Sequence, residues 1–185
     1  MTSSPLVRTG AVAAPVLLFG YGVLRLIDGL DGHRDKGAWM WNTGHVMFFA
    51  AMVLLGALAV GARRMLPSRD FGNRLASNLA VIGALAGTAA FLWVIAGDLV
   101  PSFADAAPLP GPLSIAGNAV FVLGLVTLLF QLVRAHRLPA WSPVAVLFAF
   151  LLIPVSLDLI PAAAVLLAAG LLPLAGGRAR LSPAA

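Results

Sequence analysis

Residues 143–176, PVAVLFAFLLIPVSLDLIPAAAVLLAAGLLPLAG, decide between two architectures for this chain. The stretch is apolar except around Asp158, and it is too long for one ordinary membrane span, which needs about 20 apolar residues to cross about 30 Å of hydrocarbon. Pro154 and Pro161 flank Asp158. Because proline removes a backbone donor and disfavours helix in the residue before it, we expect two short spans joined by a tight turn.

The rest of the chain has the same character. It has 185 residues, of which 61% are hydrophobic and 10% charged, whereas soluble domains carry about 25% charged residues. This composition indicates a lipid bilayer as the surroundings. The predicted fold is all-α, a single domain of residues 1–185 forming a bundle of six transmembrane helices, with five spans as the alternative. The expected spans are residues 10–29, 39–62, 75–98, 113–133, 143–157 and 161–176.

The charged residues support six spans, because they separate onto two sides. One side receives Arg8, Arg63, Arg64, Arg69, Arg74, Arg134, Arg137, Arg178 and Arg180. The other receives Asp28, Asp31, Asp35, Asp98, Asp105 and Asp158, with Arg25, Arg34 and Lys36. The positive-inside rule makes the arginine-rich side cytoplasmic. Five spans would place Arg178 and Arg180 outside, so we expect both termini in the cytoplasm. The net charge of +5 thus reflects topology, and we expect no nucleic-acid partner.

The start of the chain imitates a secretory signal peptide, since Arg8 precedes the apolar segment AVAAPVLLFGYGV. No small-residue cleavage site follows; Arg25 and Asp28 follow instead, so we expect an uncleaved first span. The acidic residues are all Asp and the basic ones almost all Arg, and Ala, Gly and Pro are abundant. This usage indicates a GC-rich bacterial genome, and hence a bacterial plasma membrane.

Arg25 lies about one turn inside the outer end of the first span. Tyr21, Arg25 and Asp28 follow an i, i+4, i+7 pattern and share one helix stripe. We expect Arg25 to pair with Asp28, which would offset part of the cost of removing its charge from water. Two interpretations stay open: an interfacial anchor whose side chain extends to the headgroups, and one wall of an outward-opening polar pocket.

Other polar residues are expected at a similar depth and form the candidate polar cluster. Its members are Tyr21, Arg25, Asp28, Asn42, His45, Asp98, Asn118 and Asp158. Ionisable residues within membrane spans are functional candidates, and His45 is suited to respond to external pH. Gly83 and Gly87 form a G-x-x-x-G pair for close helix packing. Asp98 lies about three turns beyond Gly87 on the same face, so we expect it to point into the bundle.

The acidic run beside the first span resembles two enzyme motifs in part. Asp28, Asp31 and Asp35 have the spacing of the first aspartate motif of membrane prenyltransferases, which holds magnesium and a diphosphate. The chain departs from that family because it lacks a second aspartate motif, has Ile27 in place of Asn, and places the run outside. The run also resembles membrane phosphatidyl-alcohol transferases, without the Ala-Arg that should follow Asp-Gly. A solvated turn is the simpler interpretation, with a weak calcium contact as the alternative.

Several chemistries lack their residues. There is no cysteine and no glutamate, and the motifs H-E-x-x-H and G-x-S-x-G are absent. His33 and His136 are expected in loops on opposite sides, which leaves His45 as the one histidine in the membrane. We therefore predict no haem, no zinc site, no other metal or cofactor, and no catalytic residue.

Three segments resemble small multi-pass membrane proteins of actinobacteria that have no assigned activity. They are YGVLRLIDGLDG, the GH pair that opens the next span, and ARRMLP after it. The resemblance covers about the first 70 residues, and its pattern lies on Tyr21, Arg25, Asp28, Gly44 and His45. It implies neither a reaction nor a ligand.

The leading functional hypothesis is a non-enzymatic accessory protein or ligand-binding scaffold with an outward-facing polar cluster. A small proton-coupled transporter or channel is the alternative, with Asp98 or Asp158 exchanging protons, and a membrane-embedded enzyme is third. A pocket reaching from the cluster toward Asn78 or Gln131 would favour transport, and a dry, closed inner half would favour the scaffold. We expect lipid around the protein, and a second copy or another membrane protein as the candidate partner.

Overall fold

The computed structural model describes residues 4–30, 32–33, 36–67 and 70–176. Over these ranges the chain forms helices and no strand. The helices are α1 (Pro5–Asp28), α2 (Trp39–Met65), α3 (Phe71–Leu99), α4 (Pro101–Ala106), α5 (Gly111–Arg134), α6 (Trp141–Val155), the 3-10 helix η1 (Leu157–Leu159) and α7 (Ile160–Ala175). The all-helical prediction is confirmed for the described part of the chain.

The helix boundaries have local causes. Ser4 caps α1, its side chain accepting a hydrogen bond from the amide of Val7, and Pro5 occupies the first turn, where a missing N–H costs nothing. Asp70 caps α3 in the same way by accepting from the amide of Asn73 at 2.7 Å. These caps explain why α1 and α3 begin several residues before the expected spans at 10 and 75.

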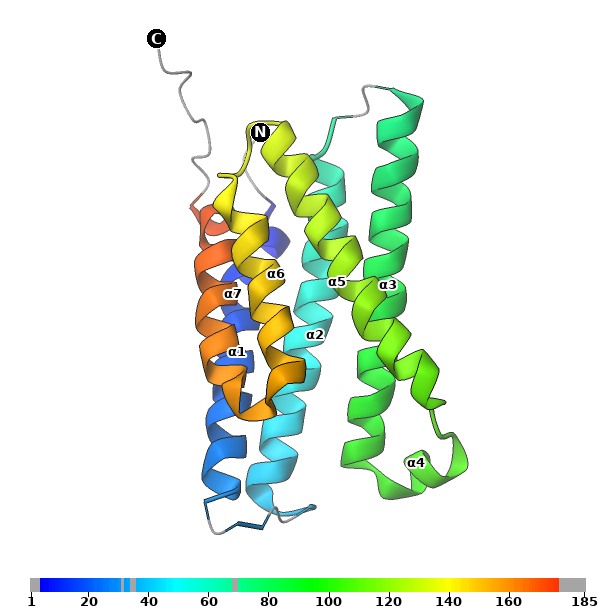
Figure 1. Ribbon diagram of the computed structural model, residues 1–185, viewed down its shortest axis with the longest axis vertical. Helices are drawn as coiled ribbons and strands as arrows, with labels where there is room; N and C mark the ends of the chain where they lie inside the picture. Colours follow the sequence, from blue (N-terminus) through cyan, green and yellow to red (C-terminus); the bar gives the residue numbers. More distant parts are fainter. Residues whose placement is uncertain (1–3, 31, 34–35, 68–69, 177–185) are drawn as a thin grey trace.

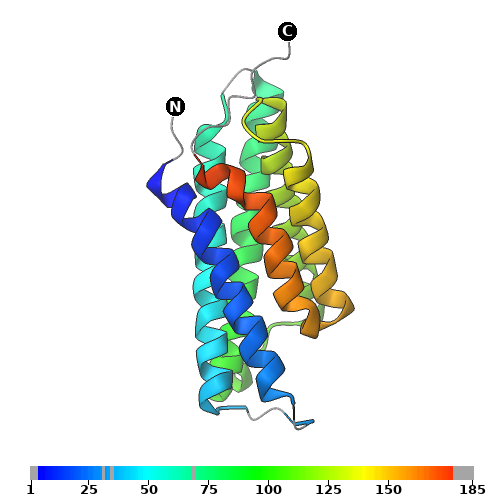
Figure 2. The ribbon, with the colours of Figure 1, turned by 90° about the vertical axis from the view of Figure 1, so that its left-hand side faces the viewer.

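The long apolar stretch is divided as its prolines predict. α6 ends at Val155, and the Ser156 hydroxyl accepts from the amide of Asp158 at 3.2 Å to start η1. Pro161 occupies the first turn of α7. α6 and α7 form an antiparallel hairpin whose turn lies short of the adjacent ends of α1 and α2 (Figures 1 and 2). This short hairpin distinguishes one side of the bundle from the other.

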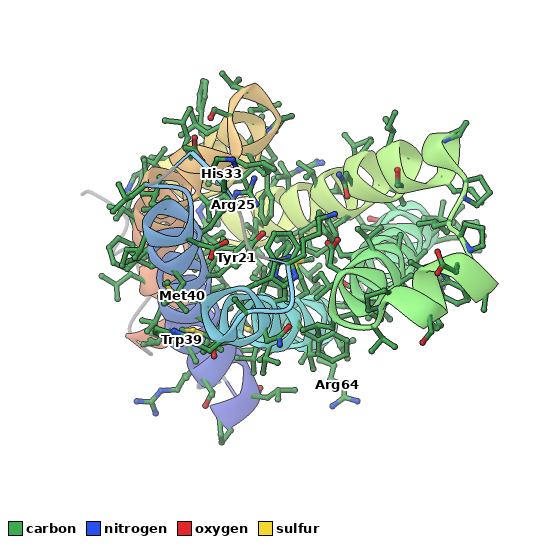
Figure 3. The ribbon with its side chains drawn as sticks, turned by 90° about the horizontal axis from the view of Figure 1, so that it is seen from below. Tyr21, Arg25, His33, Trp39, Met40 and Arg64 are labelled. Atoms are coloured by element: carbon green, nitrogen blue, oxygen red, sulfur yellow. The ribbon has the colours of Figure 1, made fainter. Side chains whose placement is uncertain are left out.

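The long helices run alternately up and down in two layers. Viewed along the bundle, α1, α2 and α3 form one layer, and α7, α6 and α5 the other (Figure 3). α1 packs on α7, and α3 on α5. α1 and α7 come close at Gly22, where an added Cβ would lie 2.7 Å from Pro161 Cδ. Gly22 is thus level with the start of α7.

Charged residues separate along the bundle axis. The end at which α1 begins and α2 finishes, at the top of Figure 1, carries Arg8, Arg63, Arg64, Arg74, Arg134 and Arg137, and is called the arginine end. The opposite end carries Asp28, Asp98, Asp105 and Asp158, and is called the aspartate end. Asp70 is at the arginine end, where it caps α3.

A chain of aromatic rings crosses the bundle between its layers. Tyr21 of α1 stacks on Phe48 of α2, with ring centroids 4.8 Å apart. Edge-to-face contacts then lead through Phe91 of α3 and Phe121 of α5 to Phe150 of α6, at centroid distances of 6.0, 5.5 and 5.2 Å. These geometries are the favourable ones for aromatic pairs. Five helices therefore share one packed layer of rings, close to the aspartate end.

Five described helical units are long and apolar enough to cross a membrane. They are α1, α2, α3, α5 and the unit of η1 with α7. α6 is apolar but has only 15 residues. Large hydrophobic side chains cover the outside of the bundle. Several have more than half of their area exposed, among them Leu79, Ile82, Leu123 and Leu172. This outward apolar surface is typical of a membrane-embedded protein.

Candidate functional site

His45 is the buried centre of the polar cluster. Its side chain points from α2 into the bundle and is 3% exposed. Its Nδ1 lies 2.8 Å from the carbonyl oxygen of Trp41, one turn earlier on the same helix, and its Nε2 lies 3.6 Å from Oδ2 of Asp98 on α3. The ring packs against Tyr21 at 5.3 Å and Trp41 at 4.2 Å between centroids. The histidine is therefore enclosed by rings on two sides and faces a carboxylate on a third.

Asp98 joins the two helices through both its backbone and its side chain. The indole Nε1 of Trp41 donates to the Asp98 carbonyl oxygen at 3.1 Å. The carboxylate faces His45, yet the side chain is 38% exposed. Asp98 thus points partly into the bundle, but the expectation that it shares the face of Gly87 is wrong. It faces α2, whereas Gly87 on the same helix faces α5.

Arg25 lies one turn beyond Tyr21 on α1. Viewed from the aspartate end, Arg25 and Tyr21 point toward the middle of the bundle, and Trp39 lies toward its periphery (Figure 3). Arg25 and Asp28 line one cavity of about 10 Å³ together with Trp41 and His45, the size of a single water molecule. The Nε of Arg25 is buried and has no hydrogen-bond partner.

The expected ion pair between Arg25 and Asp28 is wrong. Both residues are described, and no ion pair within 4.0 Å joins them. Asp28 is the last residue of α1, and the chain leaves the helix at Gly29. Sharing a helix stripe places the two side chains beside one cavity, but helix spacing alone does not turn their charged groups toward each other. Arg25 therefore carries a buried N–H without an acceptor.

Beside Asp98 is a much larger cavity of about 560 Å³, called here the aspartate-end pocket. The end of α3, the short helix α4 and the start of α5 form its walls. Its lining is Lys36, Gly37, Trp93, Val94, Gly97, Asp98, Leu99, Pro101, Phe103, Ala104, Asp105, Ala107, Pro108, Leu109 and Ser114. The Trp93 indole donates to the carbonyl of Ala107 at 2.9 Å and packs on Phe103 at 5.1 Å between centroids. These contacts hold α4 against α3 and shape the pocket.

Asn42 and Asn118, two of the other expected cluster residues, do not line the small cavity at this centre. Asn42 is exposed, and its side chain donates to the carbonyl of Gly37 at 2.9 Å, so it fixes the start of α2. Asn118 is exposed on α5. Asp158 is exposed in η1, which packs against α1, α6 and α7. The structure therefore brings together Tyr21, Arg25, Asp28, His45 and Asp98.

Gly83 and Gly87 both face α5, but they differ in how closely that helix approaches. A Cβ on Gly87 would lie 2.5 Å from the carbonyl oxygen of Gly117 and 2.6 Å from the amide nitrogen of Phe121. A Cβ on Gly83 would lie 3.2 Å from a methyl group of Val120. The approach is reciprocal, because a Cβ on Gly124 of α5 would lie 2.4 Å from the carbonyl oxygen of Ala80. The backbones of α3 and α5 thus meet at Gly87 and Gly124.

The middle of the bundle is closed by apolar side chains. Between the aspartate-end cluster and the arginine end lie Met52, Leu55, Leu58, Leu125, Leu128, Leu129 and Leu167, each at most 1% exposed. The hydroxyl of Thr88 is satisfied by its own helix through the carbonyl of Ala84 at 2.8 Å. Among the described residues, no polar path joins the cluster to Asn78 or Gln131.

The arginine end has a separate polar site around Ser77. The Ser77 hydroxyl lies 2.7 Å from Oε1 of Gln131 and 2.5 Å from the carbonyl of Asn73. A cavity of about 150 Å³ adjoins these groups, with Arg134 on its wall. Nearby, Arg63 donates through Nε to the side chain of Asn78 at 2.9 Å. These hydrogen bonds connect α2, α3 and α5 at the arginine end of the bundle.

Within the described ranges, no three side chains of His, Cys, Asp or Glu lie close enough together to hold a metal ion. Asp31 and Asp35, the other members of the expected aspartate run, lie outside the described residues, as do Arg34, Arg69, Arg178 and Arg180. The predictions for these positions therefore stay predictions.

Sequence reasoning missed the walls of the aspartate-end pocket. Residues 99–112 were expected only as a connection, but they contain α4. One signal was available: Val100 precedes Pro101, and proline is common at the first position of a helix. The hydrogen bonds of Trp41 to Asp98 and of Trp93 to Ala107 depend on tertiary packing that no local pattern reports.

Comparison with protein-family models, curated proteins and solved structures yields no match for this chain. The resemblance to actinobacterial membrane proteins therefore rests on the three short segments quoted above.

Proposed function

We propose that this chain is an integral protein of a bacterial plasma membrane that crosses it six times, with the arginine end in the cytoplasm. The separation of arginine and aspartate to opposite ends supports this orientation through the positive-inside rule. The antiparallel pairing of α6 with α7 supports a sixth crossing, since it returns the chain to the arginine end. The aspartate end then faces outward.

We propose further that the protein is a non-enzymatic scaffold that binds a small amphiphilic molecule in the aspartate-end pocket. The observation that carries this proposal is the pocket itself: about 560 Å³, walled by Trp93, Phe103 and Leu109, with Asp98 and Lys36 as charged groups. Cavities of about 300–1,000 Å³ with mostly apolar walls and a few polar groups are typical small-molecule sites. An accessory role beside another membrane protein is compatible with this function.

Native mass spectrometry of the detergent-purified protein tests the proposal. We expect the wild type to retain a small molecule, and a Trp93→Ala variant to lose it because that change removes a wall of the pocket. Trp141→Ala is the matched control, since Trp141 is exposed at the start of α6, at the other end of the bundle. Equal occupancy in the Trp93→Ala protein would contradict binding in this pocket.

A proton-coupled transporter is the second candidate, and the contact of His45 with Asp98 is the observation in its favour. The closed apolar middle opposes it, because protons and substrates need a polar route. Proteoliposomes loaded with a pH-sensitive dye distinguish the two. We expect no proton flux above that of empty vesicles. A flux that Asp98→Asn abolishes would replace the scaffold by a transporter.

A further inference from the structure

The hydrogen bonds of His45 determine which ring nitrogen carries its proton. Nδ1 lies 2.8 Å from the carbonyl oxygen of Trp41. A carbonyl oxygen only accepts hydrogen bonds, so Nδ1 must be the donor. In the neutral ring, Nε2 then has no hydrogen and presents a lone pair. That lone pair faces Asp98.

The contact between Nε2 of His45 and Oδ2 of Asp98, at 3.6 Å, is therefore attractive only when His45 carries a second proton. An ionised carboxylate also presents lone pairs, and two acceptors repel when they face each other. Protonation of His45 at Nε2 turns the contact into an attractive imidazolium–carboxylate pair. The pair accordingly has two states, which differ by one proton and by one unit of charge.

The same carboxylate belongs to the aspartate-end pocket. Asp98 is on the pocket wall, and more than a third of its side chain is exposed. Of the residues that the structure describes, the charged ones in the pocket wall are Lys36, Asp98 and Asp105. One ammonium against two carboxylates leaves one excess negative charge while His45 is neutral. A proton on His45, which contacts Asp98 on the side away from the pocket, neutralises this excess negative charge.

Within the described ranges, the other titratable and charged groups beside His45 can be named for each packed element. α1 contributes Tyr21, whose ring contacts the imidazole, and Arg25 and Asp28, which line the small cavity beside it. α3 contributes Asp98. Before α2, the Lys36 ammonium lies 5.7 Å from the centroid of the Trp41 ring. Arg25 and Asp28 carry opposite charges, so Asp98 is the group whose charge His45 controls most directly.

We infer that the aspartate-end pocket binds an organic cation, an ammonium group on an apolar body, and that this cation displaces the proton shared by His45 and Asp98. The inference rests on the proposed binding function and names its ligand class. The ammonium takes the place of the imidazolium as the positive partner of the Asp98 carboxylate. The proton leaves Nε2 for solvent, and the imidazole returns to its neutral form with hydrogen on Nδ1. The faces of Trp93 and Phe103 provide further attraction for a cation.

Isothermal titration calorimetry on the full chain in nanodiscs tests this with three similar probes: 2-phenylethylammonium, 2-phenylethanol and 3-phenylpropanoate. We expect the cation to bind at least tenfold more tightly than the alcohol, and the anion least. Its affinity should rise with pH, by up to tenfold per unit, as expected when binding releases one proton. Repeating the titration in buffers of different ionisation enthalpy counts that proton.

Variants separate the two parts of the inference. Asp98→Asn should remove the preference for the cation over the alcohol. His45→Gln should bind the cation with an affinity that no longer changes with pH and without proton release. Lys36→Met and Asp105→Asn are matched pocket-wall variants that remove opposite charges. The first should tighten cation binding and the second weaken it, and both should still release a proton.

The outcomes are distinguishable. Equal affinity for all three probes would overturn the cation inference and leave the amphiphile proposal intact. Proton release that persists in the His45→Gln protein would overturn the exchange. Binding of none of the probes would overturn both the inference and the proposed function. Nanodiscs with and without phosphatidylethanolamine identify the source of the ammonium, since competition by this lipid indicates a headgroup and its absence a soluble amine.

Discussion

The close approach of α3 and α5 makes a sharp prediction about two glycines one turn apart. A methyl group on Gly87 would lie 2.5–2.6 Å from backbone atoms of Gly117 and Phe121, which cannot rotate away. The helices would have to separate, and overpacking of this kind costs about 1–3 kcal/mol. A methyl group on Gly83 would meet a side-chain methyl of Val120 at 3.2 Å, which can yield by a few tenths of an ångström, and the Val120 carbonyl oxygen at 3.5 Å, an ordinary contact.

Both substitutions gain the same intrinsic helix propensity, about 1 kcal/mol at most. The free energy of unfolding should therefore stay level or rise slightly for Gly83→Ala. For Gly87→Ala it should be lower than for Gly83→Ala by about 1–3 kcal/mol, the overpacking term alone. Unfolding in mixed micelles, followed by circular dichroism, measures this difference. Because both variants carry the same Gly→Ala change in the same helix, differences in helix propensity largely cancel. Equal stability of the two variants would refute the backbone contact at Gly87.

Three further changes test other parts of the structure. Replacing Arg25 by Met should leave the unfolding midpoint level or raise it, because the change removes a buried N–H without an acceptor; a loss above about 1 kcal/mol would indicate a stabilising contact for the guanidinium. Phe121→Ala should lower the free energy of unfolding by about 3–5 kcal/mol, because its fully buried ring packs against Phe91 and Phe150. Phe130→Ala is the control and should cost far less, since Phe130 is 43% exposed. Similar losses for the two variants would contradict the chain of aromatic contacts. The chain has no cysteine, so in intact cells an impermeant maleimide should label Ser102→Cys but not Thr9→Cys, and the reverse pattern would invert the proposed orientation.

Much of the fold was predictable because bilayer physics acts on composition and length. Apolar runs of about 20 residues predict helices, and the prolines around Asp158 predict the turn that the structure places at Ser156–Leu159. The sorting of arginine and aspartate predicts which helix ends meet. Apolar runs and prolines are local signals, and the charges alternate between arginine and aspartate from one loop to the next. Neither kind of signal depends on how the helices pack.

The site was less predictable because helix rotation decides which polar groups meet. Asn118 follows Gly117, the residue at which α5 approaches α3. Successive helix residues point about 100° apart, so a glycine in contact turns its neighbour away from that contact. The contact of His45 with Asp98 and the pocket formed by α4 depend on residues more than 50 positions apart or on a loop that folds back. Depth along the membrane was readable from the sequence, but direction around each helix was not.

The unequal lengths of the helices have a consequence for the lipids around this protein. At 1.5 Å per residue, α2 extends about 40 Å and α6 about 22 Å, against a hydrocarbon core of about 30 Å. In the proposed six-span arrangement the bilayer beside α6 and α7 would thin locally, which would draw headgroups and water inward on that side. Arg25 lies one turn beyond Gly22, the residue level with the start of α7. The depressed membrane surface would reach the depth of this guanidinium, so the hydrophobic mismatch on one flank would bring water and headgroups to the level of Arg25.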